Sequence, residues 1–283
     1  MEDLARIDDS QELMPIEVEE FRQTIYQYYA AHRREMPWRD SRDPYHILVS
    51  EIMLQQTQVE RVLVKYELFI STFPDFSSVS IVPLQEVLGV WQGLGYNRRA
   101  IALQKICRLV VTEYGGVLPT SVETLQTFPG IGPATAGAIC AFAFNQPTVF
   151  METNIRRVFL HFFFPNKHGV KDKEILPLVE RTLDTRSPKR WYHALMDYGA
   201  MLKKDNHNPN RRSAHYSRQA PFQGSNREIR GLILKTVLGK PDLTERELIR
   251  AVDKNPERVS SIITQLTKEG FLVRAGNRLK ISP

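Results

Sequence analysis

Glu51 is a carboxylate placed where it could act as a general acid. On a helix it shares one face with Ile47, Leu48 and Leu54, which lie three or four residues away. Burial among apolar side chains raises the pKa of a carboxyl group, so the protonated form that a general acid needs is favoured at neutral pH. The alternative interpretation is an ordinary glutamate on the solvent side of a helix.

Two amides, Gln55 and Gln56, follow Glu51 by one helical turn. Amide side chains can hydrogen-bond to the edges of nucleobases or fill a gap in a duplex, so we expect both residues to contact DNA. Their position beside a candidate acid favours a functional site over a surface glutamate.

A second carboxylate, Glu152, stands at a predicted helix start, after the apolar residues 149–151 and two positions before Asn154. Helix capping explains this pattern by itself, since Thr153 or Asn154 could cap the helix and Glu152 could complement its dipole. A catalytic carboxylate with an amide beside it would show the same spacing. The residues alone favour capping.

A tight turn, Pro129-Gly130-Ile131-Gly132, separates two predicted helices. Glycines let backbone N–H groups approach a phosphate, and the start of the next helix adds positive potential. Small residues that allow close packing follow, and Thr135 lies among them. This pattern predicts a helix–hairpin–helix that holds the DNA backbone without reading its sequence, rather than a plain turn between helices.

The elements that must position these residues are predicted to be helices. Apolar residues recur every three or four positions across residues 16–202, and Gly and Pro separate the helical runs. No strand is predicted before residue 270. In residues 226–283, three helices precede two short alternating runs about Gly276-Asn277, an order that resembles a winged-helix domain. The third helix of such domains usually contacts DNA, but here it holds few basic residues.

We therefore predict a mainly α protein, with a two-lobed all-α helix–hairpin–helix domain followed by a small winged-helix (α+β) domain. The predicted divisions are an acidic N-terminal segment (1–19), the helix–hairpin–helix domain (20–202), a basic linker or DNA-contacting segment (203–225) and the winged-helix domain (226–283).

Composition excludes several classes of protein. The chain has 283 residues, 42% of them hydrophobic, but no apolar run of about 18 residues that would predict a membrane span. Its N-terminal sequence lacks the basic start and apolar core of a secretory signal, so a cytoplasmic location is expected. Two cysteines, Cys107 and Cys140, are too few for a four-cysteine zinc site or iron–sulfur cluster. We predict no metal site among the side chains and no membrane partner.

Basic residues are concentrated in the segment 203–230, and the formal net charge of the chain is +6. A solvated linker explains such a segment. Arg211, Arg212 and Arg218 could also bind phosphates, and aromatic residues between and after them could stack on bases. We predict DNA contacts from these arginines.

Motifs along the chain resemble those of the helix–hairpin–helix base-excision DNA glycosylases, the endonuclease III superfamily. The resemblance spans residues 20–202 and rests on the segments 48–57, 91–100, 129–137 and 151–158. Within that superfamily, residues 37–39, 51–59 and 91–96 are most similar to the adenine DNA glycosylase (MutY) branch.

The resemblance implies a role for each matched residue. Glu51 corresponds to the acid that protonates adenine N7, and Glu152 to the carboxylate that stabilises the positive sugar as the glycosidic bond breaks. Asn154 corresponds to an amide that helps to hold that site. Gln56 and Tyr96 correspond to residues that are inserted into the duplex to support the extruded nucleotide.

The remaining match is the hairpin, where Gly130 and Gly132 correspond to the glycines that bind a phosphate. The resemblance also implies a monovalent cation there, held by backbone carbonyls.

The chain departs from the family pattern in several places. Glu152 replaces the expected aspartate and adds one methylene. Ala134 stands where bifunctional relatives carry the lysine that forms a Schiff base, so no lyase activity is expected. The four-cysteine cluster loop after residue 202 is replaced by the basic segment, so no iron–sulfur cluster is expected. Residues 226–283 are too short for the C-terminal domain by which the adenine branch recognises 8-oxoguanine.

The sequence therefore predicts a monofunctional DNA glycosylase that hydrolyses the N-glycosidic bond of an extruded base, with mispaired adenine as the favoured substrate. Two alternatives stay open: removal of uracil or thymine from mismatches, and a DNA-binding protein without catalysis. The expected partner is double-stranded DNA with a mismatched or damaged base. We expect a monomer without a resident cofactor, at the nucleoid in the cytoplasm.

Overall fold

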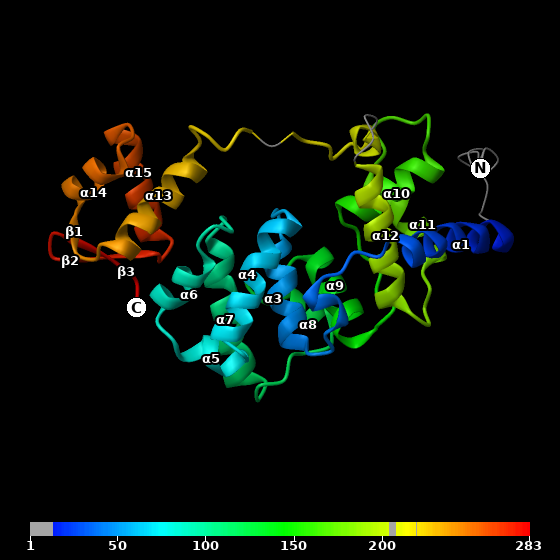
Figure 1. The fold of residues 1–283 in the computed structure, drawn as a ribbon, viewed down its shortest axis with the longest axis horizontal. Helices are drawn as coiled ribbons and strands as arrows, with labels where there is room; N and C mark the ends of the chain where they lie inside the picture. Colours follow the sequence, from blue (N-terminus) through cyan, green and yellow to red (C-terminus); the bar gives the residue numbers. More distant parts are fainter. Residues whose placement is uncertain (1–13, 204–207, 219) are drawn as a thin grey trace. The chain divides into compact units, whose positions relative to one another are not determined.

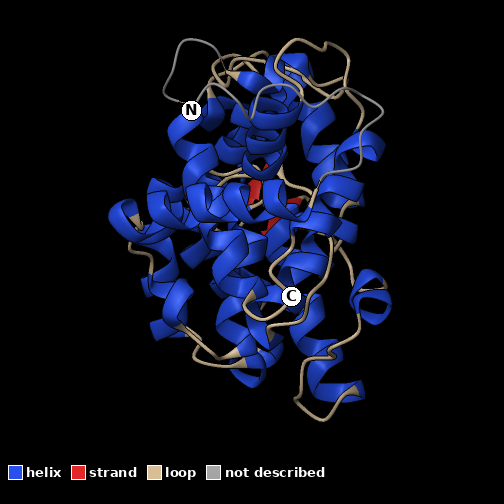
Figure 2. Ribbon diagram, turned by 90° about the vertical axis from the view of Figure 1, so that its right-hand side faces the viewer, coloured by secondary structure: helices blue, strands red, loops and turns tan. Residues whose placement is uncertain are grey.

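The computed structural model describes residues 14–203, 208–218 and 220–283 (Figure 1). Helices dominate these residues, as Figure 2 shows, and short strands form one small sheet. This confirms the mainly α fold that the apolar periodicity predicts. The chain divides into two compact units, which we call unit 1 (residues up to Leu48, Thr120–Thr127 and Ile131–Arg218) and unit 2 (Val49–Pro119, Phe128–Gly130 and Gln219–Pro283).

Unit 1 is built from helices around an aromatic core. Phe21, Phe159 and Trp191 are buried, and the ring of Phe21 makes edge contacts with the other two. α10 and α12 pack together, and α1 packs on α12. The elements are α1 (Pro15–His32), α2 (Pro37–Asp40), α8 (Val122–Gln126), α9 (Pro133–Phe144), α10 (Thr153–Phe163), α11 (Asp172–Thr182), α12 (Pro188–Leu202) and the 3-10 turn η2 (Pro209–Arg212).

The predicted division at residue 20 falls inside α1, which already begins at Pro15. Residues 1–13, which hold most of the predicted acidic segment, lie outside the described part of the chain. Part of the basic segment, residues 204–207 and 219, does so as well.

Unit 2 holds four helices of its own before the C-terminal segment. They are α4 (Val59–Thr72), α5 (Phe76–Ile81), α6 (Leu84–Trp91) and α7 (Arg98–Glu113). α5 packs on α7 and α4 packs on α6, with Trp91 fully buried against Phe69. α3 (Pro44–Leu54) begins in unit 1 and ends in unit 2.

The C-terminal segment, residues 226–283, contains the three helices and the hairpin that the sequence predicts. The elements are α13 (Asn226–Gly239), β1 (Leu243–Thr244), α14 (Glu245–Val252), α15 (Pro256–Lys268), β2 (Leu272–Ala275) and β3 (Arg278–Ile281). The predicted capping box is confirmed, since Thr244 caps α14 and Glu247 reaches back to it. β1 corrects the prediction of no strand before residue 270: it pairs with β3 in the antiparallel order β1-β3-β2, but two residues are too short to show alternation.

Close helix packing in unit 1 depends on a glycine. α12 approaches α10 where Gly199 faces the backbone of Asn154, and a Cβ at Gly199 would overlap the Asn154 carbonyl. The absence of a side chain there lets α12 support the start of α10. None of the helices in the described ranges is long and apolar enough to cross a bilayer.

Candidate active site

Glu51 lies in the last turn of α3 and is half-buried. Ile47 and Leu48, one turn earlier, are buried almost completely, and so are Ile52 and Met53 beside it. Glu51 is therefore neither fully exposed nor fully buried, and it adjoins the buried apolar part of α3, which favours the interpretation as an acid over that of a surface glutamate.

The end of α3 is held by a buried arginine, Arg99. Its Nη1 donates hydrogen bonds to the carbonyl oxygens of Ile52, Met53 and Gln55, at 3.0, 2.6 and 2.6 Å. The carbonyls of Ile52 and Met53 belong to the last turn of α3 and that of Gln55 follows it, so they lack partners within the helix. Burial lowers the pKa of Arg99 to about 10.

Arg99 also holds the loop between α6 and α7. Its Nη2 donates to the carbonyl oxygens of Leu94 and Gly95, at 3.2 and 3.0 Å. One guanidinium therefore fixes both the segment after Glu51 and the loop that carries Tyr96. Sequence reasoning missed this role, because only the tertiary fold brings the accepting carbonyls together.

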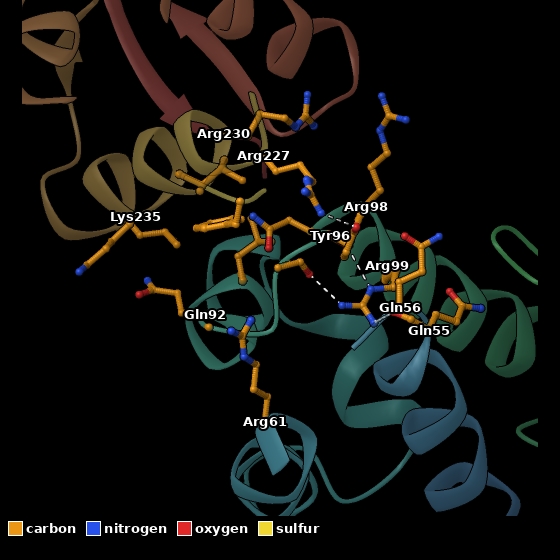
Figure 3. Close-up of a pocket in the computed structure, with 18 of the residues that line it drawn as sticks. Gln55, Gln56, Arg61, Gln92, Tyr96, Arg98, Arg99, Arg227, Arg230 and Lys235 are labelled. Atoms are coloured by element: carbon orange, nitrogen blue, oxygen red, sulfur yellow. Dashed lines mark hydrogen bonds between the residues drawn. The ribbon is translucent and has the colours of Figure 1, made fainter. Parts of the chain in front are cut away.

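Gln56 and Tyr96, predicted to enter the duplex, both have left-handed backbones, with φ of 54° and 46°. Such a conformation costs a non-glycine residue about 1–2 kcal/mol and is typical of functional loops. Both residues line the same cavity in unit 2, together with Gln55 (Figure 3). The structure thus brings these three predicted DNA-contacting residues together.

Two arginines flank the ring of Tyr96. The guanidinium of Arg99 lies 5.5 Å from the ring centre, and Nη1 of Arg227 in α13 donates to the Tyr96 hydroxyl at 2.9 Å (Figure 3). Arg227 was not among the predicted site residues. The left-handed backbone and the two arginines together fix where the tyrosine ring points.

The hairpin has the backbone that its glycines predict. Gly130 has a φ of 78°, and a Cβ there would come within 3.2 Å of the Ala102 Cβ. Its carbonyl oxygen accepts a hydrogen bond from Gln55 Nε2 at 3.1 Å. Gly132 is the N-cap of α9, and Thr135 lies half-buried in the first turn of that helix. The helix–hairpin–helix is confirmed.

Glu152 is itself the N-cap of α10, a role that the sequence assigned to Thr153 or Asn154. Its Oε1 accepts hydrogen bonds from the backbone N–H groups of Asn154 and Ile155, at 2.7 and 2.8 Å. Its Oε2 accepts one from Asn154 Nδ2 at 3.2 Å. Burial raises the pKa of Glu152, and the two backbone hydrogen bonds oppose that rise.

Asn154 is oriented by a second buried arginine, Arg157, which sequence reasoning also missed. Nη1 of Arg157 donates to Asn154 Oδ1 at 2.7 Å and to the Gly199 carbonyl at 2.5 Å. Its Nε donates to Asn208 Oδ1 at 3.1 Å. The amide of Asn154 is thereby turned so that its N–H group faces Glu152.

The predicted DNA-binding arginines of the basic segment differ in their surroundings. Arg212 donates to the carbonyl oxygens of Leu160 and Pro165, at 2.6 and 3.0 Å, and is only partly exposed. Its geometry is that of a structural residue that secures η2 against α10. Arg211 and Arg218 are exposed, so both can reach a phosphate.

The cysteines of this chain cannot bind the iron–sulfur cluster that belongs to the family pattern. A cluster of that kind needs four thiolates, and the chain has two cysteines, Cys107 in α7 and Cys140 in α9. Both are buried, and burial raises the pKa of Cys140 to about 11, which disfavours a thiolate. Within the described ranges, no three His, Cys, Asp or Glu side chains are grouped to hold a metal ion.

Comparison with known families matches one segment of the chain, which includes both carboxylates of the candidate site. Residues 49–181 match the HhH-GPD superfamily of base excision DNA repair proteins. The chain carries an HhH-GPD domain. That domain includes Glu51, Tyr96, the hairpin glycines and Glu152.

The HhH-GPD domain is similar to curated adenine DNA glycosylases. The chain is 36% identical over 187 residues to the one from Buchnera aphidicola subsp. Baizongia pistaciae, covering 64% of this chain and 52% of that protein. It is 38% identical over 185 residues to the one from Mycolicibacterium smegmatis, covering 63% of this chain and 61% of that protein. The chain thus spans between about half and two thirds of the length of these relatives.

Solved structures show the same fold. A thermostable thymine-DNA glycosylase aligns with a TM-score of 0.61 and 28% identity, over 68% of this chain and 90% of that one. An endonuclease III bound covalently to DNA aligns with a TM-score of 0.53 and 20% identity, over 75% of this chain and 92% of that one. The second likeness concerns the fold alone.

Proposed function

We propose that the chain is a monofunctional DNA N-glycosylase that releases an extruded, mispaired adenine. The observation that carries the proposal is the pair of partly buried carboxylates in the HhH-GPD domain, Glu51 in α3 and Glu152 at the start of α10. Glu51 follows the buried apolar residues Ile47 and Leu48 by one turn of α3, and Glu152 accepts hydrogen bonds from three N–H groups. The three N–H donors and the nearby arginines stabilise the charged form of Glu152 against the burial that raises its pKa, and this suits the anion, whereas the apolar neighbours of Glu51 suit the acid.

Glu51 is the proposed acid. In its protonated form it gives a proton to a ring nitrogen of the base, so that the base leaves as a neutral molecule. Glu152, as the carboxylate, stabilises the positive charge that develops on the sugar as the C1′–N bond breaks. Water adds to C1′ and loses a proton, and the products are the free base and an abasic site. Ala134 offers no amine for a covalent intermediate, which fits hydrolysis without strand cleavage.

The proposed partner is double-stranded DNA with a mismatched or damaged base. Gln56 and Tyr96 would enter the duplex while the target nucleotide is extruded, and Gly130, Gly132 and Thr135 would contact the backbone. Gln55 would steady the hairpin through its bond to Gly130. Arg211 and Arg218 would add phosphate contacts from the basic segment.

We further propose a protein that acts as a monomer on DNA in the cytoplasm and works without an iron–sulfur cluster. The cysteine count and the burial of both thiols support the last point. We also propose a monovalent cation at the hairpin. Backbone carbonyls would hold it, so it needs no metal-binding group of side chains, and none is found among the described residues. Residues 203–225 would be the linker to a winged-helix domain formed by residues 226–283.

A panel of duplexes tests the proposed reaction. Each duplex carries one adenine opposite guanine or 8-oxoguanine, or one uracil or thymine opposite guanine, and alkali-labile sites are measured with enzyme in excess. We expect cleavage at adenine. Cleavage only at uracil or thymine would instead support the second candidate, which the likeness to the thymine-DNA glycosylase favours. Tight binding to every duplex without release of any base would support the remaining alternative, a DNA-binding protein without catalysis.

A further inference from the structure

The C-terminal segment contacts the α6–α7 loop and the start of α7 through charged side chains. Arg98 at the start of α7 forms an ion pair with Glu269, which caps the end of α15. Arg230 of α13 pairs with the same carboxylate. Arg227, also on α13, donates to the hydroxyl of Tyr96. α13 therefore lies beside the loop whose tyrosine is proposed to enter the duplex.

A cavity of about 590 Å³ lies between α13 and this loop. Its volume is in the range of small-molecule sites. Leu88, Leu234 and Leu238 give it an apolar floor, and the exposed ring of Phe222 stands at its edge. Such a combination accepts a planar base or a sugar rather than a hydrated ion.

The cationic side chains around the cavity face no carboxylate in its lining. Arg61 of α4 and Lys235 of α13 are exposed, and Arg227 adds a third positive charge (Figure 3). The residues that line the cavity include no Asp or Glu. Glu269, which forms ion pairs with Arg98 and Arg230, is not part of the lining. The charge of the cavity suits a phosphate.

The exposed face of α15, the helix that contacts DNA in most winged-helix domains, is much less suited to DNA. Glu257, Arg258 and Lys268 are its exposed charged residues. Arg258 already donates to the carbonyl of Gly224 and to Asn226 Oδ1. Basic residues of the C-terminal segment that face the HhH-GPD domain lie on α13 instead.

We propose that this cavity binds one nucleotide of the DNA strand, and that α13 rather than α15 is the DNA-contacting helix of the C-terminal segment. The phosphates are bound by Arg61 and Lys235, and the base or sugar lies on the leucine floor beside Phe222. The proposal rests on the proposed function, because it places the nucleotide next to Gln56 and Tyr96. Nothing in the HhH-GPD match, which ends at residue 181, assigns a ligand to this segment.

The test measures binding without catalysis. The probe is a duplex with a stable abasic-site analogue, and its affinity is followed by fluorescence anisotropy across a range of salt concentrations. The double variant Arg61→Ala/Lys235→Ala should lower the slope of log K against log salt by about 2, since each lost phosphate contact removes about 0.9. The control Arg250→Ala/Lys268→Ala removes the same charge from exposed positions outside the cavity, and its slope should match the wild type.

A second pair of variants tests the base-binding part of the cavity. Phe222→Ala should weaken binding about tenfold, as expected for a lost base–aromatic stack, and Phe222→Tyr should restore it. Equal slopes for the wild type and Arg61→Ala/Lys235→Ala would overturn the inference while leaving the glycosylase proposal intact. Displacement of the duplex by micromolar free nucleoside monophosphate would also overturn it, because the cavity would then bind free nucleotides. A wild-type protein that binds no duplex would contradict the proposed function itself.

Discussion

At the scale of single residues, the Glu152 side chain has an observed role as the N-cap of α10 and a proposed role in catalysis. It caps α10 through Oε1, while Oε2 has its hydrogen bond to Asn154 and is the oxygen that could face a developing positive charge. The methylene that distinguishes it from the family's aspartate is accommodated by this cap. The longer side chain folds back onto the helix start instead of extending away from it.

Replacing Glu152 should separate the two roles. Glu152→Ala removes both the charge and the cap, so we expect the single-turnover rate to fall at least about 100-fold and the free energy of unfolding to fall by about 1 kcal/mol. Glu152→Asp keeps the charge and can still cap, so its rate should stay within about tenfold of the wild type. Base release under single-turnover conditions and urea unfolding check both effects. Equal rates for the wild type and Glu152→Ala would show that the carboxylate has no catalytic role here.

Glu51→Gln keeps the shape of the side chain but cannot give a proton to the base. We therefore expect base release to fall by about 100-fold or more, while affinity for duplex DNA stays close to that of the wild type. Glu60→Gln is the matched control, because Glu60 is exposed on the next helix. Near wild-type release by Glu51→Gln would remove Glu51 from the mechanism.

At the scale of elements, the helices and their order follow from apolar periodicity, and the hairpin follows from its glycines. Helical spacing indicates that Glu51 could be a general acid, but only the resemblance between motifs gives the atom it would protonate and the role of Tyr96. Arg99 and Arg157 were missed because they bind backbone carbonyls or residues far along the chain, such as the carbonyls of Ile52 and Gly199, and only the contact of Arg157 with Asn154 is local. β1 was missed because a two-residue strand exists only through its pairing with β3.

The crossing of α12 over α10 should depend on Gly199. Gly199→Ala places a methyl group against the Asn154 carbonyl, so we expect the free energy of unfolding to fall by about 1–3 kcal/mol. Gly89→Ala is the control, since Gly89 lies in helix α6 with open space at its Cβ position. That substitution should raise stability by about 0.5–1 kcal/mol because alanine favours helix.

Urea unfolding of both glycine variants gives the comparison. The base-release rate of Gly199→Ala should also fall, since Gly199 supports Arg157 and, through it, Asn154. Equal stabilities for Gly199→Ala and Gly89→Ala would mean that the two helices can separate at no cost.

At the scale of the whole molecule, side-chain contacts as well as the chain connection hold the C-terminal segment to the rest of unit 2. Glu269 receives guanidinium groups from α7 and from α13, and so it links the HhH-GPD domain to this segment inside unit 2. Its side chain is 19% exposed, and that of Arg230 is 20% exposed, so the pair is shielded from solvent. Arg98 is mostly exposed and contributes less.

Glu269 should make the stability of this link depend on pH. Hydrogen bonds and charge from Arg98 and Arg230 lower the pKa of Glu269 to about 2. Because the pKa is lower in the folded protein than in the unfolded chain, the stabilisation is fully present above the unfolded value and is lost as pH falls toward about 2.

We expect Glu269→Gln to lower the free energy of unfolding by about 2 kcal/mol at pH 7, with the difference shrinking below about pH 4. Urea unfolding at a series of pH values measures it, with exposed Glu257→Gln on α15 as the control. A difference between Glu269→Gln and the wild type that stays constant down to pH 3 would show that the ion pairs do not hold the segment in place.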